Sequence, residues 1–481
     1  MTGDTAQTDA VPSAALSEGK RTAAFFTVLI AVVLEVVDST IVNTALPVIR
    51  QSLDASPAEM QWIVAGYLLL LGSLLLLGGR LGDALGHSRM FLAGVAAFVV
   101  ASVLCGLARN PEELIAARML QGAAGAIMAP QSMAVVQLLY SPLERVKQLA
   151  YFGLVLGLAA ILGPILGGAL IDLDVLGLGW PVIFLINLPI GLLALVLGWF
   201  VLPTAEDKAE LRVDPLGALV FSLGLGGVLY ALIEGNEKGW TLNLGALLVL
   251  AVALLAWGWW RARRREAAHL PTIIRPTLFA IPTFCWATTA SFAFAAASIG
   301  FLLVFAVALQ SGLGLSPLDT ALVHIPFGIG VMVAVGVFVP RLLPRLGKLV
   351  PLAGGLLMLA GAVASMLLIA GGDGGNAPLL VILAFTGVGM GLLNGPLGPI
   401  VVADVSREHA GTASATFRTA QQIGGAAGIA LVGGAYFARA AATGTPLAGM
   451  LPAAVVVAVL LAVTVACVWM LPRRLFAGDA D

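Results

Sequence analysis

The stretch "GRLGDALGHSR" (residues 79–89) has a weaker second copy far along the chain, "PRLLPRLGKL" (residues 340–349). Aligned, both copies hold an Arg-Leu pair and, four residues further on, a Leu-Gly pair that ends on Gly86 and Gly347. Both copies follow a long apolar run. A segment repeated at equivalent places indicates that the chain contains two related halves.

The composition is that of a membrane protein. Of the 481 residues, 60% are hydrophobic and only 11% are charged, and the mean hydropathy is +1.02. A soluble domain would carry about 25% charged residues. The net charge of −1 gives no indication of a nucleic-acid partner.

A helix that crosses a bilayer needs roughly 20 mainly apolar residues. The sequence predicts fourteen of them, so the expected fold class is an all-α polytopic membrane protein. The expected helices lie at residues 23–48, 59–79, 90–108, 113–138, 149–172, 180–202, 214–235, 241–260, 277–310, 316–340, 349–370, 377–403, 410–437 and 450–471. The long ninth run is expected to include an interfacial turn.

The basic residues predict the orientation. With the N-terminus in the cytoplasm, nineteen of the 25 Lys and Arg residues fall in inner segments, four fall in outer ones, and Arg118 and Arg418 lie within helices. Because inner loops are enriched in Lys and Arg, both termini are expected in the cytoplasm and the protein in the inner (plasma) membrane. Residues 1–21 are polar and show no signal-peptide pattern.

The two copies of the loop are eight predicted helices apart, which two six-helix halves with two helices inserted between them would produce. Parallel repeats of this kind are a known transporter design. The predicted division is a cytoplasmic tail, a six-helix bundle, a linker with the inserted pair, a second six-helix bundle and a cytoplasmic tail, at residues 1–21, 22–202, 203–265, 266–472 and 473–481.

Two carboxylates lie in the first predicted helix, in "LEVVDSTIVNTALP" (residues 34–47). Glu35 and Asp38 are three positions apart and project from the same side of a helix. A charge in hydrocarbon is unfavourable by about 2.5–3.5 kcal/mol. Two neighbouring carboxylates resist simultaneous ionisation, so this pair is a candidate proton carrier. Glu234 is a third candidate, although an interfacial position also explains it.

Arg118 lies in "RMLQGAAG" (residues 118–125), inside a predicted helix. Such a charge is expected to face the bundle interior with a carboxylate or carbonyls as partners, and the alternative is a side chain that reaches the outer boundary. In the loop at 79–89, Gly79 and Gly86 allow tight turns, and Arg80, Asp83 and Arg89 are candidates for a conformational latch. An ordinary solvated turn is the alternative there.

Glycines recur with a proline in the fifth predicted helix, at Gly157, Gly163, Pro164, Gly167 and Gly168. Small residues at this spacing permit close helix packing, and the proline permits a bend. The candidate residues for a substrate cavity are polar or aromatic and lie within spans: Asn43, Gln121, Gln131, Asn187, Phe301, Phe305, Asn394, Arg418 and Gln421.

No chemistry of an enzyme is indicated. The three cysteines and four histidines lie apart without ligand spacing, so no metal site is expected, and no catalytic constellation or cofactor motif is present. A membrane-embedded enzyme or receptor is disfavoured for this reason. An ion channel is disfavoured because no charged ring or filter-like loop appears.

Taken together, these stretches resemble the major facilitator superfamily, and within it the fourteen-helix drug–proton antiporter branch. "GRLGDALGHSR" and "RMLQGAAG" are similar to two of its signatures, "AAILGPILGG" (residues 159–168) is similar to its antiporter signature, and "WPVIFLINLPIG" (residues 180–191) to the sixth helix of that branch. Asp38 falls on the acidic position of the first-helix motif. Glu35 is additional to that motif.

The resemblance implies a secondary active exporter that uses the proton motive force and no cofactor. Asp38 would bind the proton, Arg118 would couple it to transport, and the fifth-helix glycines would permit rocking of the halves. The expected substrates are amphipathic small molecules, cationic ones included, and the partners are protons and the lipid bilayer, with the monomer as the functional unit. An exporter of one metabolite or self-made antibiotic stays open as the alternative.

Overall fold

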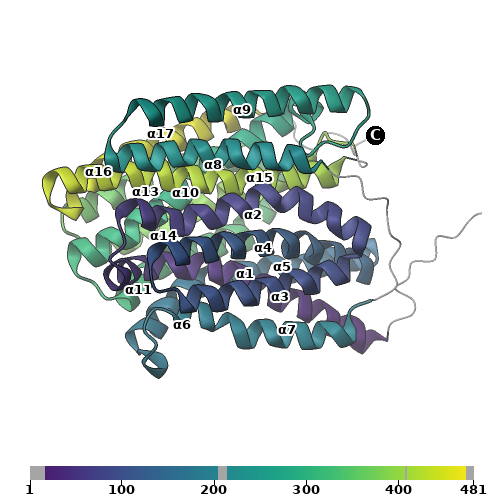
Figure 1. The fold of residues 1–481 in the computed structure, drawn as a ribbon, viewed down its shortest axis with the longest axis horizontal. Helices are drawn as coiled ribbons and strands as arrows, with labels where there is room; N and C mark the ends of the chain where they lie inside the picture. Colours follow the sequence, from purple (N-terminus) through teal and green to yellow (C-terminus); the bar gives the residue numbers. More distant parts are fainter. Residues whose placement is uncertain (1–16, 204–213, 407–408, 473–481) are drawn as a thin grey trace, which may run out of the picture.

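The computed structural model describes residues 17–203, 214–406 and 409–472. Within these ranges, the side chain of Leu176 and several side chains between residues 142 and 161 are not described. Every regular element within those residues is a helix, and the helices run side by side in one bundle (Figure 1). Most of the predicted N-terminal tail, the predicted C-terminal tail and the linker at 204–213 lie outside the described residues.

The first half of the bundle comes from the residues before the linker. Its helices are α1 (Glu18–Leu53), α2 (Pro57–Leu85), α3 (His87–Leu107), α4 (Pro111–Leu139), α5 (Pro142–Asp172), α6 (Val182–Leu185) and α7 (Asn187–Val201), with a 3-10 turn at Val175–Gly177. Prolines at the first helical position begin α2, α4 and α5, where a missing N–H removes no helix bond.

The inserted pair is α8 (Pro215–Lys238) and α9 (Leu242–Ala267), which lie together along one edge of the bundle (Figure 1). α8 packs between the two halves. The Glu237 carboxylate accepts a hydrogen bond from the Ala58 backbone N–H of α2 at 2.6 Å, and Asn236 Nδ2 donates to the Ala430 carbonyl in the second half at 3.4 Å. α9 packs mainly on α8, and most of its surface is exposed.

The second half follows in the order α10 (Pro282–Val307), α11 (Pro317–Val333), α12 (Val339–Leu346), α13 (Leu349–Ala370), α14 (Ala377–Val402), α15 (Ala410–Gly428), α16 (Gly434–Thr443) and α17 (Met450–Trp469). Single π-helical turns at Ala308–Gly312, Ala334–Phe338 and Ile429–Gly433 extend or join these helices. The ninth predicted run, 277–310, begins in the 3-10 helix Pro276–Ala280 and continues as α10.

Thirteen helices or continuous helical runs in the described residues are long and apolar enough to cross a membrane. The protein is therefore a multi-pass membrane protein. The remaining predicted span, 149–172, lies within α5, which has 31 residues, although only Leu162–Asp172 stands out as apolar among its described residues.

The sequence predicts a loop at residues 79–89, and this prediction is wrong. α2 continues to Leu85 and α3 begins at His87, so only Gly86 interrupts the helices. Gly86 has a φ of 100°, a conformation open to glycine because it has no Cβ, and one such residue is enough to reverse the chain. The aligned Gly347, between α12 and α13, also has a positive φ, of 52°.

The halves are closed against each other at one end of the bundle. There the Leu318 backbone N–H at the start of α11 donates to the Asp172 carboxylate at the end of α5, at 3.3 Å. Gln310 Nε2 donates to the Thr44 carbonyl of α1 at 2.8 Å, and the Gln310 side chain is buried. The opposite end, which carries the start of α1 and the turn at Gly86, opens into a cavity.

Candidate functional site

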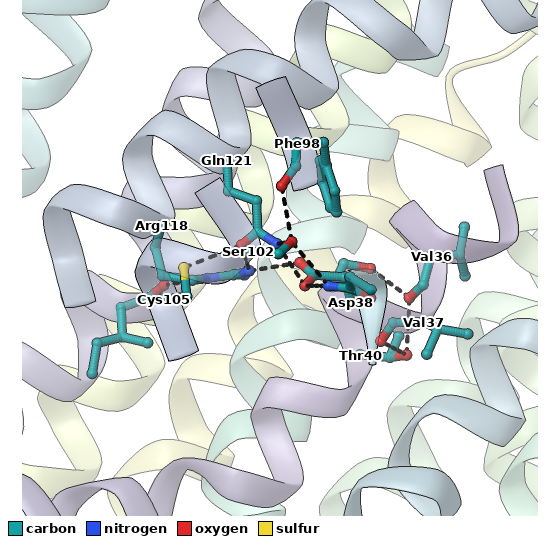
Figure 2. A network of polar contacts seen from close by, with 12 residues as sticks. Val36, Val37, Asp38, Thr40, Phe98, Ser102, Cys105, Arg118 and Gln121 are labelled. Carbon is teal, nitrogen blue, oxygen red and sulfur yellow. Dashed lines mark hydrogen bonds and ion pairs between the residues drawn. The ribbon is translucent and has the colours of Figure 1, made fainter. Parts of the chain in front are cut away.

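A buried ion pair joins α1 to α4 in the first half (Figure 2). Arg118 Nη1 lies 2.6 Å from Asp38 Oδ2, and the side chains of both residues are at most 1% exposed. The other carboxylate oxygen, Oδ1, accepts hydrogen bonds from Gln121 Nε2 and from Asn187 Nδ2 of α7, both at 2.7 Å. One cation and two amides thereby surround the Asp38 carboxylate.

Arg118 is held from several sides. Its Nε donates to the Ile63 carbonyl at 3.3 Å, and its Nη1 also donates to Gln121 Oε1 at 2.5 Å. The guanidinium lies 4.2 Å from the centre of the Tyr67 ring and 5.7 Å from that of Phe184. A desolvated ion pair is stable only when such additional contacts satisfy its remaining donors, and this one has them.

Ser102 of α3 completes the network, and sequence reasoning did not identify it. Its Oγ accepts from Gln121 Nε2 at 2.9 Å and from Asn187 Nδ2 at 3.2 Å, and donates to the Phe98 carbonyl at 2.9 Å (Figure 2). Sequence reasoning also missed Tyr67. A lone Ser or Tyr inside an apolar helix carries no pattern, so only the packing of α2, α3 and α4 reveals these roles.

The two other acidic candidates lie apart from this network. Glu35 is partly buried on α1 and makes no hydrogen bond or ion pair within the described residues, but the charges of Arg418 and Asp38 act on it. Glu234 pairs with Lys238 one turn along α8 at 2.7 Å. No hydrogen bond or ion pair connects Glu234 to Asp38 in the part of the chain that the structure describes.

The residues around Gly86 form a second polar cluster. Asp83 lies 3.6 Å from Arg80 and 3.7 Å from His87, and Gln131 of α4 contacts His87 Nδ1 at 2.8 Å. Gln131 Nε2 also donates to the Gly78 carbonyl at 2.7 Å. His87 therefore occupies the place beside Asp83, whereas Arg89 is exposed and makes no ion pair within the described residues.

The glycines of the fifth-helix motif lie at helix contacts. A Cβ at Gly163 would collide with the Thr40 side chain of α1, and one at Gly167 would lie 2.6 Å from Ile41. A Cβ at Gly168 would lie 2.7 Å from the Leu318 backbone of α11. The motif therefore brings α5 against both halves. Pro164 lies within the same helix, and Gly157 lies outside the residues described at side-chain level.

A cavity of about 1620 Å³ opens between the halves at the end that carries Gly86. Gln131, from α4, and Arg418, from α15, line it, together with Gly79, Arg80 and Asp83 near the end of α2. Residues from both halves and from the segment after α9 form its walls. Of the residues predicted to form a substrate cavity, these two, Gln131 and Arg418, line this one.

The other predicted cavity residues lie elsewhere. Phe301 and Phe305 are buried in an aromatic cluster with Phe327 and His324. Gln121 and Asn187 are bonded to Asp38, as described above. Gln421 donates to Asn394 at 3.3 Å, and the Oδ1 of Asn43 is buried without a hydrogen-bond partner among the described residues.

A helical bundle with a buried ion pair in one half and a large cavity between two halves has the features of a membrane transporter. The family model of the Major Facilitator Superfamily matches residues 28–429. The chain belongs to this family.

Curated relatives cover most of the chain. It is 36% identical over 421 residues to a probable actinorhodin transporter of Streptomyces coelicolor, covering 87% of this chain and 73% of that protein. It is 32% identical to the tetracenomycin C resistance and export protein of Streptomyces glaucescens (84% and 74% covered) and to the multidrug resistance protein Stp of Mycobacterium tuberculosis (85% and 74% covered).

The solved structures agree on the fold. A crystal structure of a peptide transporter POT in complex with sulfate superposes with a TM-score of 0.67 at 16% identity, covering 95% of this chain and 96% of that one. A bacterial homologue of the lysosomal transporter Spinster, in an inward-facing and occupied conformation, gives 0.61 at 17% identity and covers 95% of each chain.

Proposed function

We propose that this protein is a proton-coupled exporter of amphipathic organic compounds that works by alternating access. The observation that supports it most is the buried Asp38–Arg118 pair in one half of a bundle whose two halves meet at one end and enclose a cavity at the other. The relatives whose names describe export or resistance support the direction of transport and place the chain in the drug-exporting part of the family.

The proposed architecture has fourteen membrane-spanning helices, with α5 as the fifth, arranged as two six-helix repeats around the inserted pair α8 and α9. The positive φ of both Gly86 and Gly347, at aligned positions, supports the repeat. The basic loops support cytoplasmic termini in the inner membrane. In this orientation the cavity faces the cytoplasm, and the monomer is the transporting unit.

The proton would bind Asp38. Protonation removes the charge that holds Arg118 and two amides around this carboxylate, so the contacts among α1, α4 and α7 would weaken. The intact ion pair fits the state that has released its proton to the cytoplasm and is ready for substrate. Each proton that moves inward supplies about 2.3 kcal/mol per 100 mV of membrane potential.

Transport driven by a pH gradient tests the proposal. We expect Asp38→Asn in proteoliposomes to abolish gradient-driven movement of an amphipathic fluorescent dye while the protein remains inserted. Asp54→Asn is the matched control, because Asp54 ends the same helix, is exposed, and has a φ of 52° that asparagine accepts. Full activity of Asp38→Asn would exclude Asp38 as the proton site.

Glu35 is proposed as an accessory proton site. Glu35→Gln is expected to shift the dependence of transport on pH, because the carboxylate lies within the electrostatic influence of Asp38 and Arg418. An unchanged pH profile would indicate that Glu35 serves in packing.

A dedicated exporter of one compound is the second candidate, favoured by relatives whose names give single antibiotics, actinorhodin and tetracenomycin C. Efflux of a panel of unrelated dyes from cells that express the protein separates the two functions. Efflux of several dyes supports the broad exporter, and efflux of none supports the dedicated one.

A further inference from the structure

We propose that the substrates are organic anions, and that Arg418 binds their acidic group in the cavity. This inference rests on the proposed function and specifies the substrate class of that transporter. It differs from the expectation from the sequence, which included cationic compounds. The charges that line the cavity, and the partners of each, carry the inference.

The carboxylates of the cavity wall are already engaged by the protein. Asp83 lies beside Arg80 and His87. Asp214 Oδ2 accepts from Arg261 at 2.8 Å, with Arg265 at 3.7 Å, and only 2% of its side chain is exposed. A cationic substrate would have to displace these partners before it could pair with either acid.

Glu266, the third acid of the wall, is hydrogen-bonded by neutral groups and makes no ion pair within the described residues. Its carboxylate accepts from the backbone N–H of Thr277 at 3.1 Å and from the Thr277 hydroxyl. Among the described residues that line the cavity, no carboxylate is therefore without a partner. Two of the three carboxylates of the wall are ion-paired, so only Glu266 presents a charge to a cation that no basic side chain offsets within the described residues.

Of the four arginines of the same wall, Arg80 lies beside Asp83, and the other three are less engaged. Arg263 lies over the Trp259 ring at 5.6 Å, and Arg275 Nη1 contacts His409 Nε2 at 2.7 Å. Neither contact neutralises the charge of the arginine. Arg418 makes no hydrogen bond or ion pair within the described residues. The field in this part of the cavity therefore favours a negative group.

Arg418 lies well inside its helix, away from the end at which the cavity opens. It lies eight residues after Ala410, the first residue of α15, which is about 12 Å along the helix. Glu35, on α1, acts on it electrostatically but makes no hydrogen bond to it. The planar guanidinium, with its five N–H donors, remains available for a carboxylate, phenolate or similar oxyanion.

The rest of the wall suits an apolar body. Leu75, Leu76, Pro130, Met133 and Val402 line the same cavity. Its volume of about 1620 Å³ exceeds the roughly 300–1,000 Å³ of ordinary small-molecule sites, so a compound with several fused rings fits. An aromatic or polycyclic body with an acidic group is the ligand chemistry that matches both surfaces.

Two dyes of the same xanthene body and opposite charge test this inference. Fluorescein is the anionic probe and tetramethylrhodamine methyl ester the cationic one. Their binding to the purified full chain in nanodiscs is measured by fluorescence anisotropy at neutral pH, without a proton gradient. We expect the wild-type protein to bind fluorescein more tightly than the rhodamine ester.

Substitution of Arg418 supplies the second comparison. Arg418→Gln is expected to raise the Kd for fluorescein about ten- to hundredfold, the loss typical of a hydrogen bond to a charged group. Arg418→Lys should retain part of the affinity. Arg439→Gln is the control, because Arg439 is exposed on α16, in the same helical run, and does not line the cavity. It should bind fluorescein as the wild type does.

Tighter binding of the rhodamine ester by the wild-type protein would overturn the inference, and so would an unchanged Kd for fluorescein in Arg418→Gln. Absence of fluorescein binding while a pH gradient drives export of the rhodamine ester would overturn the anion class and leave the exporter intact. Fluorescein binding that depends on Arg418, in a protein that shows no gradient-driven transport, would support the anion site and contradict the exporter.

Discussion

Removing both partners of the Asp38–Arg118 pair should destabilise the protein less than the sum of the two single removals. In Asp38→Asn, the Arg118 guanidinium keeps its charge but loses the carboxylate 2.6 Å away, in a site where both side chains are at most 1% exposed. An uncompensated buried charge destabilises a protein by about 3–5 kcal/mol. Asp38→Asn with Arg118→Gln leaves no buried charge, so the double variant should recover about 2–3 kcal/mol relative to the sum of the single changes.

The free energy of unfolding of each variant is measured by denaturation with sodium dodecyl sulfate in mixed micelles. Arg109→Gln is the control, because Arg109 is an exposed arginine just before α4, and its replacement should change stability by less than about 0.5 kcal/mol.

Two results would refute the reasoning. One is a loss of less than about 1 kcal/mol in Asp38→Asn, which is the range of an exposed ion pair. The other is strict additivity of the two substitutions, which would mean that the two side chains do not depend on each other.

Three further predictions concern two helix contacts and the carboxylate that precedes α8. Gly168→Ala should destabilise the closed end, because a methyl group there would collide with the backbone of α11. The rate of cysteine labelling inside the cavity should therefore fall. Gly245→Ala is the control and should leave this rate unchanged, because a methyl group at Gly245 meets nothing within 4 Å. Gly82→Ala should lower the melting temperature by displacing the glutamine that joins α2 to α4, whereas Gly79→Ala, with only one contact at 3.7 Å, should be tolerated. At Asp214, burial tends to raise the pKa, but hydrogen bonds from α9 and from the first turn of α8, together with two arginine charges, lower it below its usual value of 3.8. Its stabilising effect should be complete above pH 3.8 and be lost as pH falls through the lowered pKa, so the melting temperatures of wild type and Asp214→Asn should converge in acid.

The parts that could be predicted from sequence are those in which one residue is conspicuous against its surroundings. A carboxylate and a guanidinium inside apolar helices each need a polar partner, and Asp38 and Arg118 form an ion pair with each other. Ser102 and Tyr67 could not be found this way, because a hydroxyl is common in such helices and its partners depend on how three helices cross.

The turn at 79–89 shows a second limit. Its glycines and charges are typical of a loop. The chain nevertheless reverses at Gly86 alone, and the other residues of this stretch belong to α2 and α3. The charge preference of the cavity was also out of reach. It depends on which acids are already paired, and the partners of Asp214 and Glu266 come from helices and turns up to 47 residues away.

The closed end of the bundle, at Asp172 and Leu318, bears on pharmacology. In the proposed orientation, a blocker that competes for the cavity of this state has no route from outside. Its apparent potency on intact cells would follow its permeability through the lipid bilayer. Compounds ranked by binding to the purified protein would then be ranked differently by a growth assay, and the difference would measure entry into the cell.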